Sequence, residues 1–562
     1  MLKRAKTELF LLGKRIFVDF RDGWSAPCAR GPGQFQFWLI ALLIGIGAGF
    51  AALLFRLGIE ALQSFVYGVD NVNRLHSFAE TLEWYWILVI PIAGGLVTGV
   101  VLHKFTPDGR VRTVSDVIEG AAMKEGRVEM RAGIASAFAS LVTLATGGSS
   151  GREGPVVHLA SVISSWVSDR LNANGITGRD LLGCAVAAAV SASFNAPIAG
   201  ALFAMEVVLR HFAIHTFAPI VIASVSGTLI SRWEFGDVTE FIMPVASRLQ
   251  FYVELPAFLI LGIVCGIVAT ILMKSIFWAE DIGNLVQSKL RMARWLRPAF
   301  AGGLLGLLAI WFPHIIGVGY ETTLAALTGE LVLHEAVVFA VLKIVAVSIT
   351  MAGRMGGGVF SPSLMVGALT GLGFGLIATG ILPEVSGSHS LYALAGMGAV
   401  AAAVLGAPIS TTLIVFELTG DWQTGLAVML TVSISTAIGS RMVDRSFFMT
   451  QLERRNIHLA AGPQAYLLAM FRVASVMRKC GDARAASEER CWEMIGDGVY
   501  VDGNATLEAA MPIFDKAQVE FIPVVTLGGA DEPPELWGAL FHVDALRTYN
   551  RALAATAAEE HS

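Results

Sequence analysis

Long apolar stretches separated by short polar ones run through most of this chain. Nearly continuous apolar runs occupy residues 37–55, 84–101, 257–273, 299–312 and 336–351. A helix needs about 20 residues to cross roughly 30 Å of hydrocarbon, so runs of this length predict membrane-spanning helices. Further runs, at 187–204 and 364–382, are shorter or interrupted by Gly or Pro. Broken helices are tolerated at membrane depth only where they are buried in protein or line a cavity, which indicates a transporter or a channel.

Composition strengthens the membrane prediction. Of the 562 residues, 55% are hydrophobic and 15% are charged, and the mean hydropathy is +0.64. Soluble domains carry about 25% charged residues, so this chain lies well outside that class. The net charge of −5 says little about partners. We expect the lipid bilayer as its surroundings and no nucleic acid as a partner.

Local charge predicts the orientation in the membrane. Residues 1–36 precede the first apolar run and carry seven Lys or Arg side chains. The positive-inside rule places this segment in the cytoplasm, and no cleavable signal peptide is evident. Further arginines follow the last apolar run, so we expect both termini in the cytoplasm, with an even number of crossings of the cell (inner) membrane: Arg441, Arg445, Arg454 and Arg455.

The pattern changes after residue 456. Residues 457–562 contain no run long enough to span a membrane. A helix pattern begins near Asn504, strand patterns follow at 520–525 and 536–540, and a last helix begins at Asp544. This βαββα-like order predicts a small α/β domain on the cytoplasmic side.

The part between these ends, residues 37–456, repeats itself. The segment Asn195-Ala196-Pro197-Ile198 matches Gly406-Ala407-Pro408-Ile409, and Glu206 matches Glu417 at the same offset of 211 residues. Repeats of this kind are typical of transporters whose halves meet around a site near the middle of the membrane. We therefore predict two related halves, at roughly 37–235 and 250–450. The shared position of the two glutamates favours a structural role for both.

One acidic residue stands in an unusual place within this pattern. Glu153 lies in the segment Gly151-Arg152-Glu153-Gly154-Pro155, a glycine-rich break between apolar stretches. An ionisable side chain at membrane depth is costly, so its presence indicates a functional site. Glycines free the backbone, and a helix beginning at Pro155 would present backbone N–H groups that favour an anion. We expect Glu153 to be either a substitute for an anion or its gate.

The second half echoes this loop as Gly358-Val359-Phe360-Ser361-Pro362. Together with the first loop and Asn195-Ala196-Pro197, it resembles the CLC family of chloride channels and chloride/proton exchangers. The resemblance implies an all-α polytopic membrane protein with two inverted-topology repeats of many tilted and broken helices. It also implies a homodimer that moves chloride without a cofactor.

The same resemblance implies the roles of the loop residues. Glu153 would be the gating glutamate, which blocks the anion path when ionised and swings away when protonated. The backbone N–H groups of Val359 and Phe360 would face the anion, beside the first loop with Gly151, Arg152 and Gly154. The tail resembles a single CBS module more weakly, which leaves nucleotide binding by the tail open; the matching segments are Val476-Met477, 522–525 and Gly538 to Asp544.

Three positions depart from the family pattern. Where the exchangers carry an internal proton-relay glutamate, this chain has Val207, preceded by Glu206. Neighbours on a helix point about 100° apart, so Glu206 cannot simply take over that place. Where the family has a tyrosine hydroxyl at its central site, Phe448 keeps the ring as a steric gate and lacks the donor. Where the family has a serine, the spacing gives either Arg112 or Thr113, and we favour an Arg112 that points into the cytoplasmic vestibule as an anion attractor.

These observations favour channel-like chloride conduction through a Glu153-gated path. The alternative is chloride/proton exchange by a non-standard internal proton path, with protons as a second partner. A fluoride-preferring carrier and a membrane enzyme using Glu153 and His158 as base and acid stay open, although we expect no enzyme. The five cysteines are scattered, and His211 and His215 lack a nearby acidic third ligand. We therefore expect no metal.

Overall fold

A computed structural model describes residues 34–68, 75–173, 175–212, 214–236, 251–383, 388–457, 459, 467–468, 471–482, 484–503, 505–526 and 535–560. The basic segment at residues 1–33 lies outside them, as does Asn504. The side chain of His215 is likewise not described.

The first half of the chain is helical from its first described residue. Its opening helix is 34 residues long, well beyond the apolar run at 37–55, because the apolar pattern continues past Arg56. The elements are α3 (Gln34–Tyr67), α4 (Leu75–Ala79), α5 (Trp84–Phe105), α6 (Val114–Met123), α7 (Met130–Ala145), α8 (Glu153–Arg170), α9 (Gly175–Phe194), α10 (Pro197–Phe203), the π-helix η2 (Ala204–Leu209) and α11 (Ile214–Phe235).

The second half follows a related order. Short helices again alternate with long ones. The helical structure is interrupted before each of the two segments that repeat those of the first half. The elements are α12 (Phe251–Lys289), the 3-10 helix η3 (Arg294–Leu296), α13 (Arg297–Trp311), the 3-10 helix η4 (Pro313–Ile315), α14 (Tyr320–Thr328), α15 (Leu333–Ala352), α16 (Phe360–Ile381), α17 (His389–Leu405), α18 (Pro408–Thr419), α19 (Trp422–Met442) and α20 (Phe447–Glu453).

Glycines allow these helices to pack at close range. A Cβ atom added to Gly367 on α16 would lie 2.4 Å from the carbonyl oxygen of Gly396 on α17. One added to Gly396 would lie 2.5 Å from the carbonyl oxygen of Gly367. In lipid, helices associate through such small-residue contacts because no hydrophobic force between them is available. The high glycine content therefore serves packing in most of the membrane part.

The two halves hold each other through a reciprocal pair of carboxylates. Glu206 accepts hydrogen bonds from the backbone N–H groups of Ile409 and Ser410, at 3.0 and 2.8 Å. Glu417 accepts them from Ile198 and Ala199, at 3.0 and 2.8 Å. Each carboxylate thus satisfies N–H groups at the start of the other half's helix, α18 or α10, which have no partner within their own helix. The repeat predicts this structural role for both glutamates.

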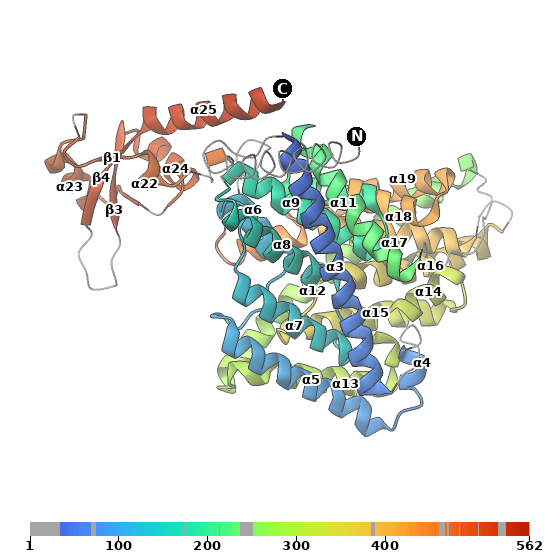
Figure 1. The fold of residues 1–562 in the computed structure, drawn as a ribbon. Helices are drawn as coiled ribbons and strands as arrows, with labels where there is room; N and C mark the ends of the chain where they lie inside the picture. The colour runs from blue at the N-terminus through green and yellow to red at the C-terminus, as the bar shows by residue number, and fades with distance from the viewer. Residues whose placement is uncertain are drawn as a thin grey trace, which may run out of the picture.

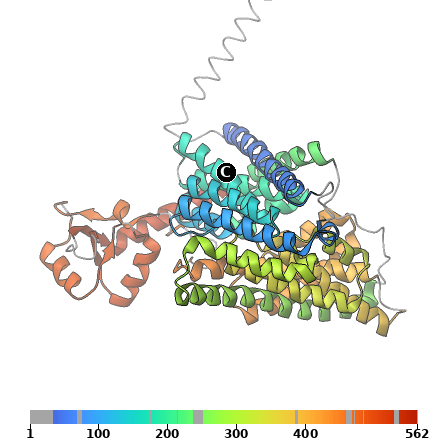
Figure 2. The same ribbon diagram turned by 90° about the horizontal axis from the view of Figure 1, so that it is seen from below.

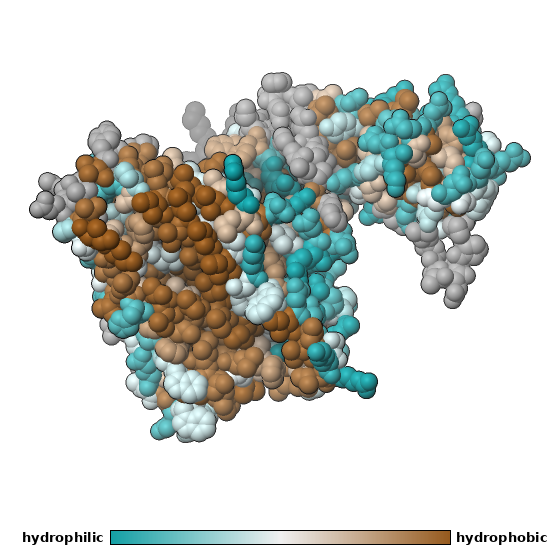
Figure 3. All heavy atoms as spheres, turned by 180° about the vertical axis from the view of Figure 1, so that it is seen from behind, coloured by the Kyte–Doolittle hydropathy of each residue, from teal (hydrophilic) through white to brown (hydrophobic). Residues whose placement is uncertain are grey.

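The surface of the helical body suits a bilayer. Among the described residues, six stretches are long and apolar enough to cross a membrane: Phe35–Tyr67, Trp84–Phe105, Val253–Lys289, Leu333–Ala352, Phe360–Ile381 and Gln423–Glu453. Figure 3 shows a broad apolar surface over the helical body and a far more hydrophilic one over the tail. Trp84, Tyr85 and Trp86 are exposed together at the start of α5, as is typical of the aromatic belt at a membrane interface.

The tail forms a small α/β unit with its own hydrophobic core. Its elements are α22 (Val473–Val476), β1 (Arg478–Lys479), α23 (Glu488–Gly496), β2 (Val501–Asp502), α24 (Leu507–Ala517), β3 (Phe521–Thr526), β4 (Glu535–Phe541) and α25 (His542–Glu560). The sheet order is β1-β4-β3-β2, with β2 parallel to β3 and the other pairs antiparallel.

From β2 onward this order confirms the predicted βαββα pattern, and the bounds of β3 and β4 differ by one residue from those of the two predicted strands. The sequence analysis did not predict α22, β1 and α23. Leu507, Phe514, Ile522 and Leu540 meet in a core separate from that of the helices. Figures 1 and 2 show the tail to one side of the helical body, and α25 lies at the same end of the body as the start of α3.

The reciprocal carboxylates generate a stability prediction. Glu206→Ala and Glu417→Ala each remove the acceptor of two backbone N–H groups, so each should lower the free energy of unfolding by about 1–3 kcal/mol. Thermal unfolding of the purified protein in detergent, followed by tryptophan fluorescence, measures the change. Glu330→Ala, which removes an exposed carboxylate, is the matched control. Equal unfolding midpoints for all three variants would contradict the structural role.

Candidate functional site

The two glycine loops meet in the structure. The N–H group of Gly151 donates to the carbonyl oxygen of Gly358 at 2.7 Å, and the N–H group of Gly358 donates back to Gly151 at 2.7 Å. This pair of bonds joins the two loops as a short antiparallel bridge. It brings together the N-termini of α8, which follows the first loop, and α16, which follows the second.

The start of α8 differs from the sequence prediction. The helix begins at Glu153, with Arg152 as its N-cap residue, two residues before the predicted start at Pro155. Proline lacks only the backbone N–H, which has no acceptor within the first turn, so Pro155 fits inside that turn as well as at its start. Consequently Glu153 belongs to the helix N-terminus itself rather than to the loop before it.

Glycine is required where the loops approach each other. Gly357 has a φ of +122°, a backbone conformation that residues with a side chain rarely adopt. A Cβ atom at this position would lie 2.0 Å from the Oγ atom of Ser150. The loops can therefore meet at hydrogen-bonding distance only because this position lacks a side chain.

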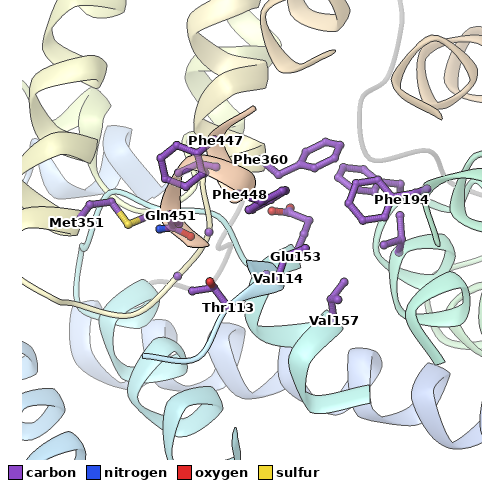
Figure 4. Close-up of a pocket in the computed structure, with 16 residues that line it drawn as sticks. Thr113, Val114, Glu153, Val157, Phe194, Met351, Phe360, Phe447, Phe448 and Gln451 are labelled. Atoms are coloured by element: carbon purple, nitrogen blue, oxygen red, sulfur yellow. The ribbon is translucent and has the colours of Figure 1, made fainter. Parts of the chain in front are cut away.

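Glu153 lies buried at this junction. Its side chain is 3% exposed. Oε1 accepts a hydrogen bond from the hydroxyl of Ser361 on α16, and Oε2 has no hydrogen-bond partner among the residues that the structure describes. Figure 4 shows the carboxylate pointing toward the rings of Phe448 and Phe360. Helix N-termini favour negative charge, so the Glu153 carboxylate occupies a place that would also favour an anion.

A small cavity adjoins the carboxylate. Its volume is about 20 Å³, which is enough for one water-sized particle. Apart from Glu153, every lining residue is uncharged, and most are apolar or aromatic. The lining consists of Thr113, Val114, Glu153, Gly154, Val157, Val190, Phe194, Phe203, Met351, Gly357, Gly358, Val359, Phe360, Phe447, Phe448 and Gln451.

Some of the residues expected from the sequence lie together around the cavity. Glu153, Gly154, Val359, Phe360, Phe448 and Thr113 line it, although they come from both halves of the chain. Gly151 does not line it and acts through the bridge to Gly358. Sequence reasoning missed Ser361, Phe194 and Gln451. The serine stands inside the second loop motif, so its polar side chain was the one available signal.

Arg112 is surrounded by carboxylates. Its guanidinium group pairs with Asp108 at 2.8 Å and Glu129 at 3.2 Å, with Asp116 at 3.8 Å, and it does not line the cavity. Partial burial raises the pKa of Asp108, but its hydrogen bond to Arg112 and the charge of Arg112 hold that pKa below its usual value. Asp116 is also paired with Arg455 at 2.9 Å, so the three carboxylates surround two arginines, and the vestibule role of Arg112 stays a prediction. Of the two candidate residues, Thr113 reaches the cavity.

Arg152 also points away from the cavity. One of its guanidinium nitrogens donates to the carbonyl oxygen of Ser193 at 3.2 Å. The guanidinium carbon lies 5.2 Å from the centre of the Tyr320 ring, within range of a cation–π interaction. Arg152 therefore joins the start of α8 to α9 and α14 and does not line the cavity.

The residues at the expected internal relay position lie elsewhere. Val207 is buried in the π-helix η2 and does not line the cavity. The adjacent Glu206 is bound to the start of α18. Neither provides a carboxylate that faces Glu153.

Metal binding finds no support within the described part of the chain, where no group of three or more His, Cys, Asp or Glu residues could hold an ion.

Comparisons with known proteins agree on one family. Residues 94–440 match the family model described as voltage gated chloride channel. A ClcB-like chloride channel protein of Ralstonia nicotianae is 32% identical over 398 residues, which cover 70% of this chain and 90% of that protein.

Two solved structures share the fold. One, titled a slow cyanobacterial Cl⁻/H⁺ antiporter, has a TM-score of 0.66 at 19% identity and covers 75% of this chain and 97% of its own. The other, titled a CLC-type fluoride/proton antiporter, has a TM-score of 0.60 at 19% identity and covers 73% and 96%.

The close approach of the loops generates a prediction about folding. Gly357→Ala should displace the loop bridge, because the added methyl group meets Ser150 and the φ of this position disfavours a side chain. We expect a lower yield of monodisperse protein in size-exclusion chromatography. Gly380→Ala is the control, since nothing lies within 4 Å of a Cβ atom added there. Equal yields for the two variants would show that the bridge tolerates a side chain.

Proposed function

This chain belongs to the family of voltage-gated chloride channels, and on that premise we propose that it carries chloride across the membrane through a path gated by Glu153. One observation carries the proposal. The buried Glu153 carboxylate borders a water-sized cavity at the point where the N-termini of α8 and α16 converge.

The proposed path attracts the anion without a fixed cation. Helix N-termini present N–H groups and a partial positive charge, whereas the lining residues other than Glu153 are uncharged. Conduction needs binding that is favourable enough for entry and weak enough for exit, and dipoles provide both. Ionised Glu153 competes with chloride for these dipoles. Protonated Glu153 leaves the path and lets chloride pass.

Two departures from the family pattern support conduction rather than exchange. Val207 offers no proton-carrying group, and Glu206 is occupied at the start of α18. Phe448 lines the cavity with a ring that has no hydroxyl. A path with one titratable group senses protons but has no second station through which to pass them on.

Chloride/proton exchange is the second candidate, and His158 favours it. This side chain lies on α8, just over one turn beyond Glu153, and is 2% exposed. Its Nδ1 atom has no hydrogen-bond partner within the described ranges. A buried imidazole with an open nitrogen is a group through which a proton could reach Glu153 without Val207.

Reconstituted vesicles separate the two candidates. Purified protein in liposomes, with a chloride gradient and no proton gradient, should give a zero-current voltage at the chloride equilibrium potential. Imposing a proton gradient should leave that voltage unchanged if chloride alone moves. Uphill proton uptake driven by chloride would overturn the channel proposal in favour of exchange.

Glu153 provides the direct prediction from this mechanism. A gate closed by one ionised group should make wild-type flux fall about tenfold per pH unit above its midpoint. Glu153→Ala removes the blocking carboxylate, so chloride efflux should remain near the acidic wild-type value at every pH. Chloride-electrode recordings from pH 4 to pH 8 measure this, with Glu330→Ala as the control. A Glu153→Ala variant that kept the full pH dependence would exclude Glu153 as the gate.

The protein is a multi-pass membrane protein, and we propose the cell (inner) membrane as its location, with both termini in the cytoplasm. The start of α3 and the whole of α25 lie at one end of the helical body, which supports placing both ends of the chain on the same side of the membrane. We also propose a homodimer. Chemical cross-linking of the protein in native membranes tests that assembly.

A further inference from the structure

We propose that Ser361 is a positioning residue for the gate: its hydroxyl holds the ionised Glu153 carboxylate in the anion path and so sets the pH at which the path opens. The inference rests on the proposed function and adds a determinant of its regulation. Ser361 contacts the gate and not the cavity, since it is absent from the cavity lining.

The direction of the Ser361 hydroxyl sets it apart from its neighbours. Buried hydroxyls on these helices commonly donate to a carbonyl oxygen one turn back in their own helix, as Ser363 does to Val359 at 2.6 Å and Thr370 does to Val366 at 2.7 Å. Ser361 is the second residue of α16 and donates across to Oε1 of Glu153 on α8, 208 residues away in sequence. The serine thus links the N-termini of the two helices.

The surroundings of Ser361 hold it in this orientation. Its side chain is 4% exposed, and the hydroxyl of Tyr320 interacts with it from α14. The Tyr320 ring is held in turn beneath the Arg152 guanidinium. An ionised carboxylate can only accept hydrogen bonds, so the Ser361 proton is directed to Glu153, and its oxygen remains available to Tyr320.

The charged and titratable groups that act on this assembly come from three helices. Arg152 is the neighbour of Glu153, Tyr320 stands on α14, and Arg56 and Glu60 on α3 act on Arg152. The other cavity-lining residues, from α6, α9, α10, α15, α16 and α20, carry no charge. Removing the Ser361 hydroxyl therefore deletes its hydrogen bond to Glu153 and its contact with Tyr320, and leaves every charge in place.

The sign of the effect follows from the charge of the acceptor. A hydrogen bond to a carboxylate is roughly twice as strong as one to a neutral group, so the Ser361 hydroxyl favours the ionised, path-blocking form of Glu153. Without the hydroxyl, Glu153 should become protonated and leave the path at a higher pH. Loss of one charge-assisted hydrogen bond corresponds to a shift of about one pH unit.

Chloride efflux from liposomes between pH 4 and pH 8 tests the proposal with the full-length protein. Ser361→Ala should move the midpoint of the pH dependence upward by about one unit. Ser361→Cys, whose thiol is a weaker donor, should move it less in the same direction. Ser363→Ala is the matched control, because it removes a buried hydroxyl two residues away that does not face Glu153.

A second pair of variants separates positioning from a general effect on folding. In the Glu153→Gln background no carboxylate charge remains, so adding Ser361→Ala should leave chloride flux and its pH profile unchanged. Equal changes in flux in both backgrounds would overturn the proposal.

Different results would contradict the proposed function and the proposed role of Ser361. A wild-type protein without pH-dependent chloride flux would overturn the proposed function and this inference together. A pH-dependent wild type whose midpoint Ser361→Ala leaves in place would overturn the role of Ser361 alone.

Discussion

The pair of hydrogen bonds between Gly151 and Gly358 is the contact on which the geometry of the site depends. It joins two loops from different halves of the chain, and each loop leads directly into a helix, α8 or α16. Because the loops are fixed to each other, the two helix N-termini converge on one small volume. The absence of a side chain at Gly357 permits this approach. The positions of Glu153, Phe360 and Ser361 all follow from it.

A second contact between the halves supports the same arrangement from another pair of helices. In it, Glu206 and Glu417 each accept hydrogen bonds from the start of a helix in the other half. Both contacts use groups at helix starts, where backbone N–H groups lack partners within their own helix. At the starts of α10 and α18, the carboxylates accept the hydrogen bonds of these N–H groups. The starts of α8 and α16 border the cavity instead, and Glu153 is the only carboxylate among the residues that line it. Helix starts with unpartnered N–H groups therefore serve both to join the two halves and to form the site.

Much of the site could be predicted from the sequence because its motifs express local requirements of the chain. Glycines in a loop before a proline indicate a helix start, and the repeat shows that there are two of them. Val359 and Phe360 were expected near Glu153 from these motifs, whereas the family resemblance implied Phe448 and either Arg112 or Thr113. Val359, Phe360, Phe448 and Thr113 line the cavity. The fold of the tail also followed from its alternating pattern.

Other features depend on side chains that meet only in three dimensions. Asp108 and Asp116 lie four residues to either side of Arg112 in the sequence, but Glu129, 17 residues further on, comes close to its guanidinium only in the folded chain. The link between Ser361 and Glu153 likewise depends on the meeting of α8 and α16. The start of α8 was placed two residues late because proline is typical of the first helical position but is also accepted later in the first turn.

The bridge between Gly151 and Gly358 also has a consequence for the speed of the proposed gate. In the gate proposed above, with both loops fixed to each other, Glu153 would leave the path by rotating its own side chain, and neither helix would have to move. Side-chain rotations take picoseconds to nanoseconds when space is available, whereas collective helix motions take microseconds to milliseconds. The speed of the proposed gate would then be set by how often a proton arrives at a buried carboxylate and leaves it again.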